Sequence, residues 1–445
     1  MAGSELLRSR RTGSVIALVL FAVVLLVLSG VGVLSLGQTA RVFSIRTAAE
    51  IAARTAADDG ITKAIWQLND NLKDGWSESG ALPREDNTAL PNSDATYSYI
   101  VDKANKYYGD IVSSGEEDLI DFVRSAFSTT PGAGDYVVRS IGRYHEAEKV
   151  IYATLRLVGC GDTGVLVRES ITLKAGTLVD GRDSRDPTNP DPDVLVEIGT
   201  ISTAPGAIVL NNGVTVNGNI QVGVGGVPTT VIKDLGAVVE GDKYAMTEEP
   251  EFPYIYPPAG LKDMSEIDIQ AITQTIGPAQ NGRYSLIRLK NGPAPTILEI
   301  AGGDVVLYVT GNIDMGQGSE IKIAKGATLN LYIDGNINAH EDSGFNNEPP
   351  NTPPSLKIWG NWRPDVTGGE IAQKWTINAN SECFGQIYAP SANLTVNAKG
   401  DLYGAFTANS FEMKSGGNLF YDGALRVVNP DDPGVRFVLK RWYEE

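Results

Sequence analysis

The sequence predicts a mainly β protein that begins with one long helix and continues as a single-stranded β-helix. Three features carry this prediction: an uncharged apolar run near the start, short alternating strands separated by Gly and Asn, and segments that repeat about every 20 residues. Gly is frequent, at 49 residues against 11 Phe, which favours many short strands and tight turns over a helical globule. The 445 residues leave room for two or three domains.

Composition excludes several kinds of function. The formal net charge of −17 argues against nucleic acid as a partner, because binding phosphates needs clustered Lys and Arg. Two histidines and two cysteines leave little material for a zinc site or a histidine-based catalytic centre. Outside the cytoplasm Cys160 and Cys383 could form a disulfide; the alternative is two separate buried thiols.

The first part of the chain predicts a membrane helix. Residues 14–37 carry no charge and are long enough to cross a bilayer, and the run exceeds the h-region of a cleaved signal. Three arginines in LLRSRRTG precede it and favour a cytoplasmic N-terminus, although three more arginines follow the run. The helix should continue to residue 72, with Gly60 as a point where it bends. An apolar stripe marks its second half: Ile61, Ile65, Leu68 and Leu72.

A basic leader ending in Gly13, the apolar run, and a helix carrying TAAEIAARTAADDGITKAI together resemble the N-terminal region of PilX-like minor pilins of type IV pili. The resemblance implies that residues 1–13 are a leader, cut by a prepilin peptidase between Gly13 and Ser14. It also implies a mature helix that packs with other pilins or pseudopilins. Most pilins carry Glu at the fifth mature position, where this chain has Leu18. The alternative is an ordinary signal anchor that never enters a filament.

Residues 73–164 predict a linker followed by a small antiparallel β region. Residues 73–94 are polar and rich in turn formers, and the strand-like runs ATYSYIVDKA, DYVVRSIGRY and KVIYATLRLVG follow. An acidic, Pro-rich stretch comes next. An EF-hand register there would put Val194 where Gly is required and Thr200 where Glu is required, which leaves another kind of calcium loop or a solvated turn. Its carboxylates are Asp180, Asp183, Asp186, Asp191 and Asp193.

Residues 165–425 predict the β-helix, right-handed by analogy with the commoner form. AIVLNNGVTVNGNIQVG alternates apolar and polar residues, as half-buried strands do. VVLYVTGNID at 305–314 matches LNLYIDGNIN at 329–338, and FGQIYAPSANLTV at 384–396 matches YGAFTANSFEM at 403–413. Residues 236–295 interrupt the repeats and predict an insertion or lid, in which SEIDIQAITQTIG is a short helix. Residues 426–445 predict a strand that caps the open end of the β-helix with Trp442 and Tyr443.

The pattern GDVVLYVTGNIDM, GATLNLYIDGNIN, FGQIYAPSANLTV and LYGAFTA is similar to a β-helical domain that follows PilX-like N-termini in bacterial envelope proteins. More distantly it resembles bactofilin-type repeats. These resemblances imply a single-pass protein of the bacterial inner membrane, with most of the chain in the periplasm or on a pilus outside the cell. They imply a structural role in a pilus or a related secretion system.

Neither catalysis nor a cofactor is expected. The clearest repeats carry Asn, Thr, Ser and Lys at their outward positions, without the paired carboxylates that sugar-cleaving β-helices use, and no nucleotide or Ser–His–Asp motif occurs. A binding role remains as the alternative function. Trp359, Trp362 and Trp375 lie close together in sequence, and exposed aromatic rings stack on sugars, so the chain could be an anchored adhesin for a surface glycan. Buried tryptophans are the simpler explanation.

Overall fold

A computed structural model describes residues 12–73, 81–107, 135–184, 194–347, 353–362, 373–379, 383–398, 401–414, 417–426 and 432–445. The chain divides into two compact units. Unit 1 comprises residues 1–157 and 437–445, and unit 2 comprises residues 158–436. Unit 2 is therefore inserted into unit 1, between its last two strands. The protein is mainly β with one long N-terminal apolar helix, which confirms the coarse fold prediction.

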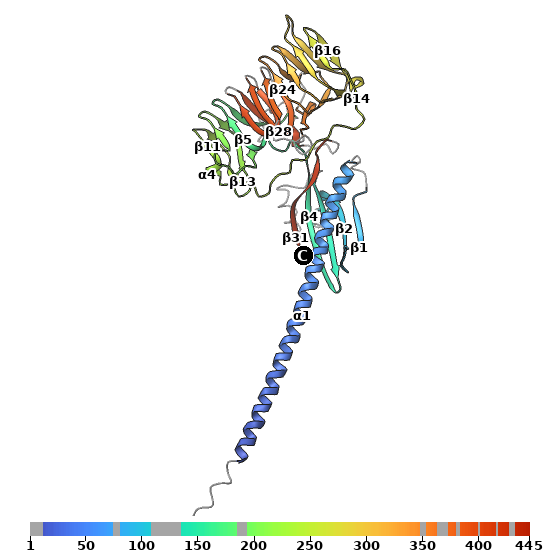
Figure 1. Cartoon of the computed structure of the whole chain (residues 1–445), viewed down its shortest axis with the longest axis vertical. Coiled ribbons are helices and arrows are strands. Elements are labelled where there is room, and N and C mark those ends of the chain that lie inside the picture. The colour runs from blue at the N-terminus through green and yellow to red at the C-terminus, as the bar shows by residue number, and fades with distance from the viewer. Residues whose placement is uncertain are drawn as a thin grey trace, which may run out of the picture. The chain divides into compact units, whose positions relative to one another are not determined.

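Unit 1 is a helix packed on an antiparallel sheet. The helix α1 (Thr12–Lys73) runs without interruption through Gly60 and is drawn in blue in Figure 1. The sheet has the order β1-β2-β3-β4-β31. Its strands are β1 (Arg84–Ala89), β2 (Thr96–Lys103), β3 (Asp135–Tyr144), β4 (Ala147–Val158) and β31 (Arg436–Glu444). The three strand-like runs of the sequence are thus confirmed as β2, β3 and β4, whereas the predicted loop at 73–94 contains β1.

The core of unit 1 comes from one face of α1 and the facing side of the sheet. Ile61 and Leu68 are buried in it, with Ile65 and Leu72 packed at its margin, so the stripe read from the sequence is the face that packs. Spacings of three and four residues place side chains on one side of a helix, which is why the pattern survives folding.

Unit 2 is built almost entirely from parallel strands. Its first part contains β5 (Val165–Leu173), β6 (Leu178–Arg182), β7 (Val196–Thr200), β8 (Ile208–Leu210), β9 (Thr215–Val216), β10 (Gly218–Val222), α4 (Pro228–Val231), β11 (Ile232–Asp234), β12 (Val238–Val239) and β13 (Lys243–Ala245). Buried and part-exposed side chains alternate along these strands, as in the BiBiB pattern of β10. This alternation is the one predicted around residues 207–223.

The second part of unit 2 follows after residues 247–261, which form no strand. It contains β14 (Lys262–Asp263), β15 (Ile267–Gln270), β16 (Thr273–Ile276), η1 (Pro278–Gln280), β17 (Gly282–Tyr284), β18 (Ile287–Lys290), β19 (Thr296–Ile300), β20 (Asp304–Val309), β21 (Ile313–Met315), β22 (Ser319–Ile323), β23 (Thr328–Ile333), β24 (Ile337–Ala339), β25 (Gly344–Asn347), η2 (Pro353–Ser355), β26 (Leu356–Gly360), β27 (Gln373–Ala379), β28 (Cys383–Ala398), β29 (Asp401–Met413), β30 (Asn418–Asp422) and η3 (Gly423–Arg426).

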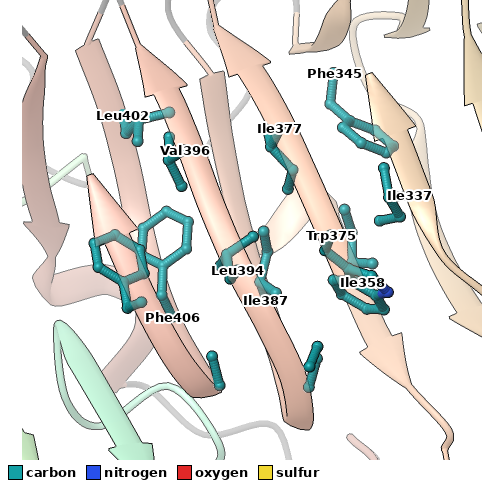
Figure 2. Close-up of a cluster of buried hydrophobic side chains, with 14 of the residues drawn as sticks. Ile337, Phe345, Ile358, Trp375, Ile377, Ile387, Leu394, Val396, Leu402 and Phe406 are labelled. Carbon is teal, nitrogen blue, oxygen red and sulfur yellow. The ribbon is translucent and has the colours of Figure 1, made fainter. Parts of the chain in front are cut away.

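The strands of unit 2 pair in register with the matching positions of the next repeat. β20 pairs with β23, which aligns Leu307 with Leu331 and Tyr308 with Tyr332, and β28 pairs with β29 at an offset of 19 that becomes 17 after a register shift. In both repeats found in the sequence, the two matching segments are therefore paired neighbours in the structure. The buried side chains of these strands form one continuous hydrophobic cluster. Figure 2 shows part of it, in which Trp375 lies among Ile337, Ile358 and Ile377.

Three predictions about the later part of the chain are wrong. The predicted insertion at 236–295 is mostly regular, because β14 to β18 pair in parallel with later strands, and only 247–261 leave the pattern. The segment SEIDIQAITQTIG, predicted as a helix, instead forms the strands β15 and β16, which lie in different sheets, and Ile267 and Ile269 alternate with exposed residues along β15. The C-terminal segment is also misassigned: β31 is an edge strand of the sheet in unit 1, beside β4, and pairs with no described strand of unit 2.

Candidate functional site

The candidate functional element is α1, whose first half is apolar and has no partner within the described residues. Among the described residues, α1 is a helix that is long and apolar enough to cross a membrane. None of its most apolar stretch is buried. Large side chains such as Leu26, Leu34 and Phe43 are more than 60% exposed. Residues 14–37 rise about 36 Å along a helix, against a hydrocarbon core of about 30 Å. This segment can therefore anchor the protein in a membrane.

The second half of α1 is fixed to the sheet through small residues. Ala53, Ala56, Ala57 and Ala64 are fully buried. A side chain at Gly142 of β3 would overlap the carbonyl oxygen of Ala53. The sequence does not reveal this contact, because an alanine-rich helix reads as good helix propensity and not as a packing surface. The close approach leaves the two halves of one helix with different surroundings.

Side-chain hydrogen bonds fix the end of α1 to the sheet. The Nε2 of Gln67 donates to Glu85 of β1 over 2.8 Å, and the hydroxyl of Tyr99 donates to Gln67 Oε1 over 2.5 Å. Burial, followed by the neighbouring Glu85 carboxylate, raises the pKa of Tyr99, so its hydroxyl stays protonated and available as a donor.

The C-terminal strand adds further contacts inside unit 1. The Asn69 side chain accepts from the backbone N–H of Phe437 and donates to its carbonyl oxygen. Arg54 pairs with Glu444 at 3.3 Å. The last residues of the chain thus help to hold the helix that begins it.

Several predicted site residues lie outside what the structure describes. Gly13 and Ser14 belong to α1 by their backbone, but their side chains are outside the described set, and cleavage between them stays a prediction. Asp186, Asp191 and Asp193 of the acidic stretch also fall outside it.

The described carboxylates of that stretch have local roles. Asp180 accepts the backbone N–H of Gly181 through its Oδ1. Among the described residues no group of three or more His, Cys, Asp or Glu side chains could hold a metal ion. Because three of the five carboxylates of the stretch lie outside those residues, the calcium loop stays a prediction.

The cysteine prediction is only half described. Cys160 is a free thiol in the part of the chain that the structure covers, while the Cys383 side chain lies outside it. Burial raises the pKa of Cys160 to about 12, so at neutral pH this thiol is protonated and a poor nucleophile. It borders a small cavity together with Lys357, Trp359 and Asp432, where Lys357 Nζ lies 2.6 Å from both carboxylate oxygens of Asp432.

The tryptophans do not form an exposed sugar-binding face. Trp359 and Trp375 are each 1% exposed, and Trp362 is partly buried. A ring with no free face cannot stack on a sugar, so the glycan interpretation is wrong for Trp359 and Trp375. Their indole N–H groups instead donate to Asn330 and to the carbonyl oxygen of Gly335.

An aromatic groove explains the burial of Trp359. Neighbouring strands align Tyr332 with Trp359 and Trp359 with Tyr388, and Ile255 packs onto the three rings. Ile255 belongs to residues 247–261. Sequence reasoning missed it because one isoleucine in a Pro-rich stretch carries no periodicity. The repeat of Tyr308 at Tyr332 was the available signal for an outward aromatic row.

Comparisons with known proteins give limited support. A family model described as "Domain of unknown function (DUF7305)" matches residues 260–428. No curated protein matches. Among solved structures, the competence-associated pilin ComZ from Thermus thermophilus is 13% identical and covers 89% of this chain and 97% of its own, with a TM-score of 0.24. A TM-score this low establishes no common fold, so a pilin interpretation must rest on α1 and its sheet.

Proposed function

We propose that the chain is a structural, non-catalytic subunit of a type IV pilus or related secretion assembly, a minor pilin or pseudopilin. One observation carries the proposal: α1 is a single helix whose first half is apolar and unpartnered while its second half is packed on an antiparallel sheet. A plain signal anchor needs only the first half. A helix that is both anchor and core element suits a subunit that leaves the bilayer and packs among similar helices.

The leader, residues 1–13, is proposed to be removed by a prepilin peptidase that cuts between Gly13 and Ser14. The mature protein is proposed to sit in the bacterial inner membrane with both units outside the cytoplasm. Leu18 departs from the usual pilin Glu. Its apolar side chain suits the bilayer, which supports the anchor and leaves the processing step to experiment.

The N-terminus tests the proposal. Protein isolated from native membranes should have a mass that starts at Ser14. A Gly13→Leu variant should keep the full leader, whereas Gly3→Leu, a matched change earlier in the leader, should be processed normally. An intact terminus in the unaltered protein would remove the pilin proposal and leave a simple membrane anchor.

Unit 2 is proposed to be a single-stranded β-helix displayed by this subunit. The support is the in-register parallel pairing of successive repeats, in which Asp314 aligns with Asn338 and accepts its side-chain N–H at 2.8 Å. Cysteines placed at 314 and 338 should form a disulfide readily. Cysteines at 314 and 320, close in sequence but on strands β21 and β22 that do not pair, should not. Equal yields in both variants would contradict the β-helix.

The adhesin alternative has lost its specific support, since Trp359 and Trp375 are buried. A glycan array on the purified protein remains its direct test. Reproducible binding would revive it, and we expect none.

A further inference from the structure

The strands of unit 2 do not stack in the order of the chain. One continuous parallel ladder runs β13-β10-β7-β5-β29-β28-β26-β23-β20-β17-β14, each strand paired with the next. The chain enters this ladder in the middle, at β5, and winds to one end at β13. It then crosses to the opposite end at β14 and winds back to β29. Residues 158–246 are the N-terminal arm, and residues 262–426 are the C-terminal arm.

The two arms meet at a seam without a covalent link. β29 pairs with β5, from Phe406 opposite Val165 to Met413 opposite Leu173, and β30 pairs with β6. Among the described strands, no other pairing joins the two arms. Within unit 2, the arms are otherwise connected through residues 247–261, called the tie here.

The tie has little slack. Eleven strands give ten spacings of about 4.8 Å, so the ends of the ladder are about 48 Å apart. Met246 still bonds to Val222 on the ladder, and Lys262 begins β14. The sixteen Cα steps between them span at most about 53–58 Å when fully extended. Most of the tie must therefore be extended, which its prolines suit, and a turn at Ala259 and Gly260 leads into β14.

The tie is anchored on both sides of the seam. Arg168 of β5, in the N-terminal arm, lies 5.1 Å from the ring centre of Phe252. In the C-terminal arm, the Tyr388 hydroxyl donates to the carbonyl oxygen of Pro253 over 2.9 Å. Ile255, at 2% exposed, fills the aromatic groove over Tyr332 and Trp359. Consecutive residues of the tie thus contact both arms.

We propose that the tie is a lock on the seam: while it stays short and anchored, the two arms cannot part at β5 and β29. Opening the seam would move the ends of the ladder apart, and the tie could follow this movement by only about 5–10 Å before it reached full extension. This device needs no filament, so it stands or falls independently of the proposed function. Within a filament it would keep unit 2 intact under load, because the chain enters and leaves that unit beside the seam, where Cys160 Sγ lies 3.9 Å from the Pro433 carbonyl oxygen.

A length change tests the lock. Eight Gly and Ser residues inserted between Glu248 and Glu249 lengthen the tie in an exposed stretch without removing an anchor. The matched control inserts the same residues after Gly225, in an exposed turn of the N-terminal arm. Amide hydrogen exchange of the full-length protein in detergent follows β5 and β29, with β20 and β23 as internal references.

The lengthened tie should speed exchange in β5 and β29 about tenfold or more, by local opening, while β20 and β23 stay protected. The control should leave all four strands unchanged. Unchanged exchange at the seam would overturn the lock. So would an equal rise in all four strands, because it would mean general destabilisation. A second variant, Ile255→Ser, should open the seam in the same selective way.

Discussion

The two units are each completed by a strand that comes from far along the chain, but the type of sheet and its packing differ. In unit 1 the closing strand is β31, which joins an antiparallel sheet covered by a helix. In unit 2 the closing strand is β29, which completes a parallel ladder on β5. Both cores contain large aliphatic and aromatic side chains, but unit 1 also depends on buried alanines that let a helix approach a sheet, whereas unit 2 stacks its side chains between parallel repeats. Similar closure can thus rest on different packing.

Removing residues 437–445 should have the largest effect and should separate the units most clearly. Unit 1 would lose its edge strand, Phe437 from the core and the Arg54–Glu444 pair. Burying Phe alone is worth about 3–5 kcal/mol, close to the whole stability of a small domain. Limited proteolysis should then degrade unit 1 while unit 2 stays resistant. Loss of unit 2 first would instead favour a role for these residues as a cap on unit 2.

Two tryptophan substitutions compare the interiors. Trp375→Ala should destabilise unit 2 by about 3–5 kcal/mol, because it opens a cavity in the cluster of Figure 2. Trp442→Ala in β31 is the matched control: that ring is 53% exposed and lies 5.5 Å from the Arg54 guanidinium, a contact worth about 0.5–1 kcal/mol. Urea unfolding measures both, and comparable losses would mean that the burial pattern is wrong.

Gly142→Ala tests the small-residue packing of unit 1. The new methyl group would overlap the Ala53 carbonyl and should cost about 1–3 kcal/mol by forcing α1 from the sheet. Gly37→Ala changes the same residue type in α1 where no neighbour lies within 4 Å, and should leave stability unchanged or raise it by up to about 1 kcal/mol. Thermal unfolding measures the stability of both variants. Equal changes in stability would contradict the close packing of α1 on the sheet at Gly142.

The smallest expected effect is a loss of stability at alkaline pH, to which buried groups contribute in both units, such as Tyr99 in unit 1 and Cys160 in unit 2. Burial raises the pKa of the Cys160 thiol to about 12, and that of Tyr332 to about 12. A group with a raised folded pKa keeps the folded state more protonated, so its contribution is complete below the unfolded pKa and is lost as pH rises toward 12. Above pH 9 the free energy of unfolding should fall by at most about 1.4 kcal/mol per pH unit for each such group.

A Cys160→Ala variant serves as the control and should flatten the part of this slope between pH 9 and 10. Iodoacetamide should leave Cys160 unmodified at pH 8 in the folded protein and label it after unfolding. Rapid labelling of the folded state would contradict the burial of the thiol.

Local patterns in the sequence predicted much of both units. The run at 14–37 and the stripe through Ile61 and Leu68 depend only on helical spacing, and both are found in α1. The repeat that aligns Tyr308 with Tyr332 depends on the two-residue period of a strand and on matched neighbours, and it too is found. The sequence predicted these features because each depends only on residues within a few tens of positions of one another.

Tertiary structure alone decided where distant segments meet. Nothing in the local sequence of the strand at 436–444 indicates that it joins β4 and not the strands of unit 2. The entry of the chain in mid-ladder, the seam at β5 and β29, and the anchoring of Ile255 on Trp359 depend in the same way on contacts between residues up to about 250 positions apart. Such pairings are selected by the free energy of the whole packed core, which a local pattern does not encode. Hence the sequence determined the elements and their faces, and the tertiary structure decided which strand closes each unit.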